Sequence, residues 1–77
     1  MKPMFKKLYQ VLRKIGVERN QIHHETNFRN DLGFESIDMV WFTNNLEFKF
    51  DIKINDSDIP KLSTVGSTLD YLQKAVN

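Results

Sequence analysis

The sequence predicts an all-α domain, a small four-helix bundle with a long loop between its first and second helices and a short third helix. Its 77 residues are enough for one domain with a small core. Apolar residues recur at helical spacing in separate segments, and Gly16, Gly33 and Pro60 stand at or near the segment boundaries. The chain contains no cysteine, which excludes a disulfide framework and a thiolate metal site.

The first helix is expected over residues 3–15. Pro3 suits a first helical turn, and Gly16 suits the stop because glycine adopts the left-handed conformation of a helix end at low cost. One side should face the core and carries Phe5, Leu8, Leu12 and Ile15, flanked by Met4 and Val11. The opposite side is basic and carries Lys6, Lys7, Arg13 and Lys14.

Residues 17–35 show no sustained period and are expected to form a long loop. The apolar residues available to hold this loop against the core are Ile22, Phe28 and Leu32. Within the loop, residues 23–25 read His-His-Glu, but adjacent His side chains point apart and no further ligand stands at useful spacing. We therefore expect an exposed loop without a metal, and no general acid–base catalysis by this chain.

The second helix is expected over residues 37–50 and is apolar on two opposed sides. With an advance of about 100° per residue, one side carries Met39, Phe42, Thr43, Leu46 and Phe50. The other side carries Ile37, Val40, Trp41, Asn44 and Phe48. Either another segment covers this second side, or the helix presents it to a partner.

The remaining helices are shorter. A third helix is expected within residues 56–62, with Ser57 or Asp58 as its cap, because Pro60 is then in the first turn, where proline is tolerated. The fourth helix should end near Val76. Residues 67–70 (Ser-Thr-Leu-Asp) resemble a capping box with Asp in place of Glu, which would start this helix at Thr68.

Ser36 stands where the long loop becomes the second helix. Gly33, three residues earlier, can take the positive φ that such a reversal often needs. A hydroxyl at this place lies beside the unpaired N–H groups of a helix start, which favour a phosphate together with the helix dipole. The simpler interpretation is that Ser36 is an N-cap.

The segment from Leu32 to Asp38 reads Leu-Gly-Phe-Glu-Ser-Ile-Asp. It resembles the type II acyl carrier protein pattern of Leu-Gly, any residue, then Asp-Ser-Leu-Asp. The likeness continues in one register over essentially the whole chain, through residues 16–17, 22, 28–31, 46–50, 52–54, 64–66 and 70–72. It implies a single carrier domain over residues 1–77 that is not an enzyme, and a fourth helix that starts just after Thr64.

The resemblance also implies that Ser36 carries 4′-phosphopantetheine, transferred from coenzyme A by a phosphopantetheinyl transferase with Mg²⁺, and that acyl groups are held on this arm as thioesters. Partners would then be this transferase and the acyl-transferring and condensing enzymes, which grip a partly exposed surface beginning at the modified serine. We expect this surface to comprise Glu35, Ile37, Asp38, Val40, Trp41 and Glu47. The core side of the second helix, with Ile54, Ile59 and Leu62, should line a space for a short acyl chain.

Two departures from the family pattern concern the pathway. Trp41 stands where the family commonly has an acidic residue, and Asn44 where it often has Met. A polyketide, lipid-modification or secondary-metabolite pathway therefore fits as well as general fatty-acid synthesis. One alternative is a peptidyl or aminoacyl carrier, whose motif more often has Gly-Gly before the serine segment, so Phe34 argues mildly against it. Another is an unmodified interaction module of the same fold.

The net charge of +1 also departs from the family, whose members are usually strongly acidic. Residues 1–30 carry seven Lys or Arg and two Glu, whereas residues 31–77 carry four Lys and eight Asp or Glu. A basic helical face is usually solvated surface, and this one is too small for the extended footprint of a nucleic-acid binder. Docking to an anionic membrane or an acidic partner remains the alternative. Because no apolar run approaches the ~18 residues of a membrane span, we expect a cytoplasmic protein. We also expect a monomer.

Overall fold

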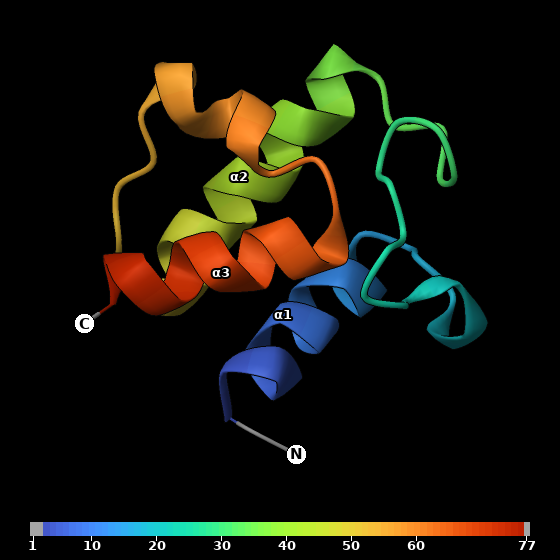
Figure 1. Ribbon diagram of the computed structural model, residues 1–77, viewed down its shortest axis with the longest axis horizontal. Coiled ribbons are helices and arrows are strands. Elements are labelled where there is room, and N and C mark those ends of the chain that lie inside the picture. The colour runs from blue at the N-terminus through green and yellow to red at the C-terminus, as the bar shows by residue number, and fades with distance from the viewer. Residues whose placement is uncertain (1–2, 77) are drawn as a thin grey trace.

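The computed structural model describes residues 3–76. The α-helices and the 3₁₀ helices (η) follow one another as α1 (Pro3–Lys14), η1 (Arg19–Gln21), α2 (Ser36–Phe50), η2 (Asp56–Lys61) and α3 (Val65–Ala75) (Figure 1). The predicted all-α class, with a long loop and a short third helix, is confirmed. Within the described residues there is no strand, and no helix is long and apolar enough to cross a membrane.

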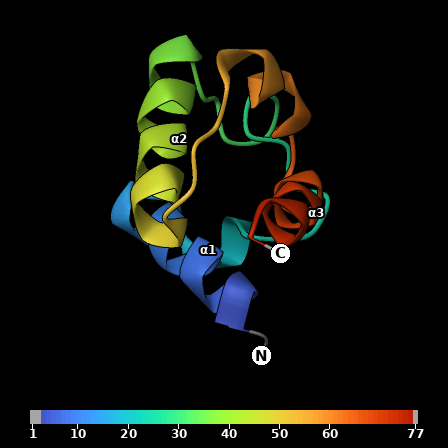
Figure 2. The same cartoon turned by 90° about the vertical axis from the view of Figure 1, so that its left-hand side faces the viewer.

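The helices surround one hydrophobic core. Figure 2 shows α2 upright on one side, η2 and α3 on the other, and α1 crossing beneath them. Every α-helix, the long loop and the segment that follows η2 contribute to this core. Its fully buried apolar side chains are Leu8, Leu12, Phe28, Phe42, Leu46, Leu62, Val65 and Leu72.

The first helix ends as predicted, within one residue. Gly16 has a φ of +100° and its N–H donates to the Arg13 carbonyl, which closes the last turn. The apolar stripe is centred differently from the prediction, because Val11 is buried and Phe5 is only half-buried and lies outside the core cluster. Successive contacts at Met4, Leu8 and Val11 follow the i, i+4, i+7 spacing of one helix face, and Phe5 falls at its edge.

The 3₁₀ helix η2 is capped two or three residues earlier than predicted. Asn55, in an extended conformation, is the N-cap in place of Ser57 or Asp58. Its carbonyl accepts the Asp58 N–H at 2.9 Å, which is the i→i+3 bond of a 3₁₀ turn. Pro60 therefore lies near the end of this helix, where it is exposed and the helix has only one further residue.

Thr64 is the N-cap of α3 and fixes where this helix begins. Its Oγ1 accepts the Ser67 N–H at 3.0 Å, and the Ser67 hydroxyl accepts the Thr64 N–H at 3.0 Å. These reciprocal bonds form a capping box in which Ser67 takes the place of the usual Glu or Gln. The helix therefore begins at Val65, just after Thr64, and the alternative start at Thr68 is wrong.

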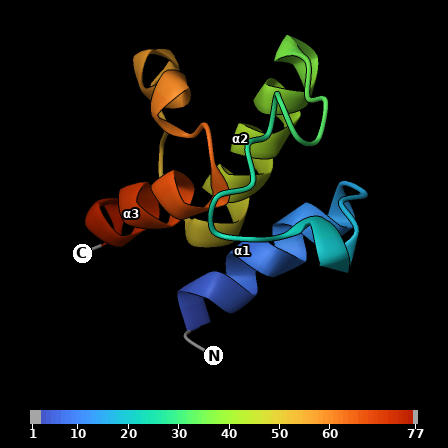
Figure 3. The same ribbon diagram turned by 45° about the vertical axis from the view of Figure 1, so that its right-hand side comes forward.

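The long loop is tied to the start of α3 by backbone hydrogen bonds. The Phe28 N–H donates to the Ser63 carbonyl at 3.0 Å, and the Val65 N–H donates to the Thr26 carbonyl at 3.1 Å. Phe28 is fully buried, while Ile22 and Leu32 pack partly buried against the core, so the predicted anchors of the loop are confirmed. The sequence did not predict η1, which lies beside the end of α1 (Figure 3).

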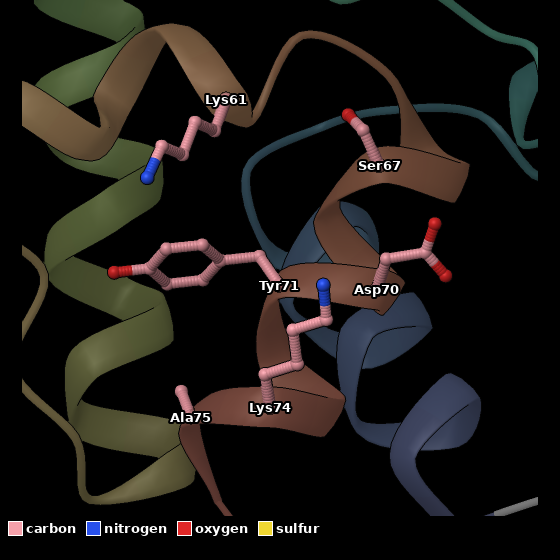
Figure 4. A pocket seen from close by; sticks show the side chains of 6 residues that line it. All are labelled: Lys61, Ser67, Asp70, Tyr71, Lys74 and Ala75. Atoms are coloured by element: carbon pink, nitrogen blue, oxygen red, sulfur yellow. The ribbon is translucent and has the colours of Figure 1, made fainter.

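One side-chain hydrogen bond joins η2 to α3. The Tyr71 hydroxyl donates to Asp58 Oδ2 at 2.8 Å, and Lys61 Nζ lies 3.2 Å from Asp58 Oδ1. Figure 4 shows Tyr71 reaching from α3 across a hollow, between Lys61 of η2 and Lys74 of α3. The hydrogen bond from Tyr71 is the main cause that lowers the pKa of the Asp58 carboxyl, and the hydrogen bond from Lys61 lowers it further. The pKa of Tyr71 is raised, first by desolvation and then by its hydrogen bond to Asp58.

The Tyr71→Phe variant should therefore lose stability in a pH-dependent way. A carboxyl whose pKa is lower in the folded than in the unfolded chain stabilises the fold above the unfolded pKa of 3.8, and this contribution is lost as the pH falls through the folded pKa. The difference in unfolding free energy between wild type and variant should thus shrink between about pH 5 and pH 2. Urea unfolding across this range tests it, and a difference that stays constant contradicts it.

Candidate functional site

Ser36 is the first residue of α2 and its side chain is exposed. The N-cap is Glu35, whose φ of −93° and ψ of 176° are extended, so the interpretation of Ser36 as the N-cap is wrong. Within the described residues, no hydrogen bond engages the Ser36 hydroxyl. The N–H groups of Ser36 and Ile37 belong to the first turn and lack partners within the helix. An accessible hydroxyl therefore lies beside the positive end of a helix.

A tight loop sets the position of Ser36. Gly33 has a φ of +71°, as the sequence predicted, and its N–H donates to the Arg29 carbonyl at 3.2 Å. The Phe34 N–H then donates to the Phe28 carbonyl at 2.9 Å. A side chain other than glycine would be strained at the positive φ of residue 33, although a Cβ there would meet no atom within 4 Å.

Three aromatic rings fix this loop to α2. The ring centroids of Phe28 and Phe34 lie 5.5 Å apart in a stacked arrangement, and those of Phe28 and Phe42 lie 4.8 Å apart. Phe34 meets Phe42 edge to face at 6.2 Å. Phe28 and Phe42 are fully buried, so the residue two positions before Ser36 is held by the core. The sequence identified Phe28 as an anchor, but assigned no packing role to Phe34.

Two carboxylates flank the serine. Glu35 is exposed, whereas Asp38 is half-buried and its Oδ2 accepts the Glu35 N–H at 2.8 Å. Asp38 therefore stabilises the first turn of α2 by accepting the N–H of the N-cap residue. Its carboxylate also places negative charge next to Ser36. Both residues lie where the sequence placed the beginning of a partner-contacting surface.

The outer side of α2 is apolar and exposed. Its large apolar side chains retain exposed fractions of 72% for Ile37, 47% for Val40, 56% for Trp41 and 90% for Phe48. The opposite side of the helix is buried through Met39, Phe42, Thr43 and Leu46. The two opposed sides predicted from the spacing are confirmed, and no other segment covers the outer one among the described residues.

Glu47 lies at the flank of this outer side, because it follows Val40 by seven residues along the helix. It is half-buried, and its Oε2 accepts the Ile54 N–H at 2.7 Å. Its carbonyl also accepts the N–H groups of Asp51 and Ile52 at the end of the helix. The carboxylate thus holds the segment that follows α2, and it is less available to a partner than Glu35.

A hollow of about 300 Å³ opens between α2 and η2. Met39, Ile59 and Leu62 give it an apolar lining, and Arg29, Pro60 and Ser63 complete the wall. Two of the three residues that the sequence assigned to an acyl-chain space, Ile59 and Leu62, therefore lie here. Ile54 is instead buried in the core cluster.

The His-His-Glu segment of the loop is joined to the start of α3 by a backbone hydrogen bond. No group of three or more His, Cys, Asp or Glu side chains is placed to hold a metal ion among residues 3–76. The His24 carbonyl accepts the Gly66 N–H at 2.8 Å, and a Cβ on Gly66 would clash with the His24 ring. Gly66 therefore provides space for His24 against α3. The sequence gave no sign of this contact because 42 positions separate the two residues.

Comparison with known proteins gives a consistent result. A family model described as "Phosphopantetheine attachment site" matches residues 6–72. The chain is 42% identical over 69 residues to the acyl carrier protein of Chlorobium phaeobacteroides, which covers 88% of each chain. It is 35% identical over 72 residues to the acyl carrier protein of Thermotoga maritima, covering 92% of this chain and 89% of the relative. The corresponding protein of Porphyromonas gingivalis is 38% identical over 64 residues, covering 83% and 82%.

Proposed function

The chain belongs to the acyl carrier protein family of phosphopantetheine-binding carriers, and on that premise we propose that Ser36 is its attachment residue. Members of this family carry acyl groups and are not enzymes. The observation that carries the proposal is the exposed Ser36 hydroxyl at the first turn of α2, inside the matched region. Its oxygen would lose its proton and form the phosphodiester bond to the phosphopantetheine of coenzyme A, while the pyrophosphate bond of coenzyme A breaks and adenosine 3′,5′-bisphosphate leaves. The arm supplies a thiol that holds acyl groups as thioesters.

The residues around Ser36 fit a phosphodiester. The hydroxyl is not engaged by another group of the described chain, so a transferase can reach it without breaking a hydrogen bond. The unpaired N–H groups of Ser36 and Ile37 and the helix dipole favour an anion at this place. Glu35 and Asp38 oppose it electrostatically, but the Asp38 carboxylate is turned to the Glu35 N–H at 2.8 Å.

The acyl chain is proposed to enter the hollow between α2 and η2. Apolar side chains line it, namely half-buried Ile59 and the buried core residues Met39 and Leu62, so an acyl chain placed there would leave water. The hollow has about 300 Å³, at the lower end of ordinary ligand pockets, which suits a short chain. The other apolar side chains on the inner side of α2, Phe42 and Leu46, are already packed within the core cluster. We therefore assign this protein to short acyl groups, and regard residues 1–77 as a single carrier domain built on one core.

Partner enzymes are proposed to dock on the outer side of α2. Ile37, Val40 and Trp41 expose apolar surface directly beyond Ser36, and Glu35 and Asp38 add negative charge at the same end of the helix. A phosphopantetheinyl transferase and acyl-transferring or condensing enzymes with a basic rim and an apolar centre would fit this arrangement. Glu47 is left out of the surface because its carboxylate binds the Ile54 N–H.

The chemistry of this surface bears on the pathway. Beyond Asp38 the outer side of α2 is apolar and neutral. Trp41 stands there where the resembled family commonly has an acidic residue, and Asn44 stands where it often has Met. Partners selected for this chain should therefore rely on apolar contact more than on charge. We propose a specialised pathway, such as polyketide or lipid-modifying synthesis, in preference to general fatty-acid synthesis.

A thiol assay tests the carrier function directly. Because the chain contains no cysteine, a thiol reagent should react with it only after treatment with coenzyme A, Mg²⁺ and a promiscuous phosphopantetheinyl transferase. One thiol per chain should then appear, and it should disappear when an acyl group is loaded and return with hydroxylamine. If no thiol appears with several transferases, the chain is an unmodified interaction module of the same fold.

Trp41→Ala tests the docking surface. Since Trp41 is 56% exposed, we expect the free energy of unfolding to change by no more than about 0.5 kcal/mol. The KM of an acyl-transferring enzyme for the loaded protein should rise about tenfold, as truncation of an aromatic hot spot does, with a smaller change in kcat. Gln73→Ala on the exposed side of α3 is the control and should change neither quantity. An unchanged KM for Trp41→Ala would exclude this residue from the interface.

A further inference from the structure

A second surface lies between α1 and η1. It is a hollow of about 650 Å³ lined by Phe5, Lys6, Tyr9, Gln10, Arg19 and Ile22, and we call it the α1–η1 groove. Figures 1 and 2 show α1 and η1 in the lower part of the molecule, whereas α2 begins at the top. A molecule bound in the groove would therefore leave the Ser36 end accessible.

The aromatic side chains of this groove are not part of the hydrophobic core. Phe5 and Tyr9 are half-buried, yet neither belongs to the core cluster or to the apolar residues packed against it. They lie four residues apart on α1 and thus on the same side of the helix. Ile22 is packed against the core cluster and adds an aliphatic side to the groove.

The groove also carries positive charge that no Asp or Glu side chain in its lining neutralises. Within residues 3–76 the ion pairs are Arg13 with Glu18 and Lys61 with Asp58, so Lys6 and Arg19 have no acidic partner. No Asp or Glu lines the groove. The Arg19 guanidinium lies 5.9 Å from the centroid of the Tyr9 ring, which places its charge over the aromatic surface.

We propose that the α1–η1 groove binds an acidic, apolar segment of a partner protein. Its carboxylates would pair with Lys6 and Arg19, and an apolar side chain would lie between Phe5 and Tyr9. Charge complementarity of this kind gives orientation and a fast association, while the aromatic surface supplies most of the burial. Such a partner holds the carrier by one end and leaves Ser36 free for successive enzymes.

An anionic membrane fits this surface less well. Membrane-surface helices insert a continuous apolar face by about 5–10 Å, whereas the apolar face of α1 is buried through Leu8, Val11 and Leu12. The aromatic side chains of the groove are half-buried in a concavity formed by two elements, so they cannot project into lipid. A peptide segment can follow such a concavity.

A displayed library of random 16-residue peptides provides the test. Peptides are selected on the wild-type chain and counter-selected on the Lys6→Glu/Arg19→Glu variant. The matched control is Lys14→Glu/Lys53→Glu, which makes the same change in charge at exposed positions outside the groove. Circular dichroism verifies that both variants fold, which is expected because Lys6, Arg19, Lys14 and Lys53 are all exposed.

Selected peptides should combine Asp or Glu with Leu, Phe or Trp. They should bind the wild type and the control alike, and bind the groove variant at least about tenfold more weakly. Tyr9→Ala should weaken them as well, and the affinity should fall with salt. Peptides that carry no acidic residues, or that bind all variants equally, overturn the proposal. A different result assigns the surface to a membrane. In that case no peptide is selected, the wild type and the control bind phosphatidylcholine–phosphatidylglycerol vesicles, and the groove variant does not.

Discussion

Ser36→Ala should abolish attachment of phosphopantetheine completely. With coenzyme A, Mg²⁺ and a promiscuous phosphopantetheinyl transferase, the wild-type chain should gain one phosphopantetheinyl mass, and the variant should gain none. The reason is that the exposed Ser36 hydroxyl is the proposed attachment oxygen and Ala has no group that can replace it. Intact-mass spectrometry separates the two results without a need for a cognate partner enzyme.

The fold should tolerate this substitution. Ser36 follows the cap and its side chain makes no hydrogen bond in the described part of the chain, so Ala, a good helix former, should be accepted at the first position of α2. Ser57→Ala is the matched control, because Ser57 is also an exposed serine of a helix and lies in η2. Modification of the Ser36→Ala chain, or loss of modification in Ser57→Ala, would place the attachment residue elsewhere.

Phe28→Ala should remove a large part of the stability of this domain. Phe28 is fully buried and its ring contacts those of Phe34 and Phe42, with centroid distances of 5.5 and 4.8 Å. Loss of a buried aromatic side chain costs about 3–5 kcal/mol, against a total of about 5–15 kcal/mol for a typical domain. Urea unfolding followed by circular dichroism measures the change. Modification of Ser36 should slow as well, because the loop that precedes it loses its anchor.

Phe48→Ala is the control for this prediction. Phe48 has the same side chain but is 90% exposed on the outer side of α2, so its removal should change the free energy of unfolding by no more than about 0.5 kcal/mol. Similar losses of stability in both variants would mean that Phe28 does not anchor the loop. A large effect of Phe48→Ala alone would mean that the outer side of α2 is covered in solution.

The sequence by itself determined the features that depend on neighbours along the chain. Helical spacing located α1 and α2, and the positive φ of Gly16 and Gly33 was expected because glycine adopts that conformation at little cost. The same spacing showed that α2 has two apolar sides. The turn expected at Gly33 and the helical spacing that begins at Ile37 also placed Ser36 at the start of this helix.

Tertiary structure decided what depends on contacts between segments rather than on the spacing within one helix. The start of α3 follows the Thr64 capping box, and the hydrogen bond from Val65 to Thr26 reinforces it, although the segment around Ser67 offers an equally good local signal. The packing of Phe34 and the capture of the Ile54 N–H by Glu47 likewise require contacts that no periodicity encodes. Helical periodicity reports which residues share a face. Which face becomes buried, and which carboxylate remains free, is decided only when distant segments meet and exclude water.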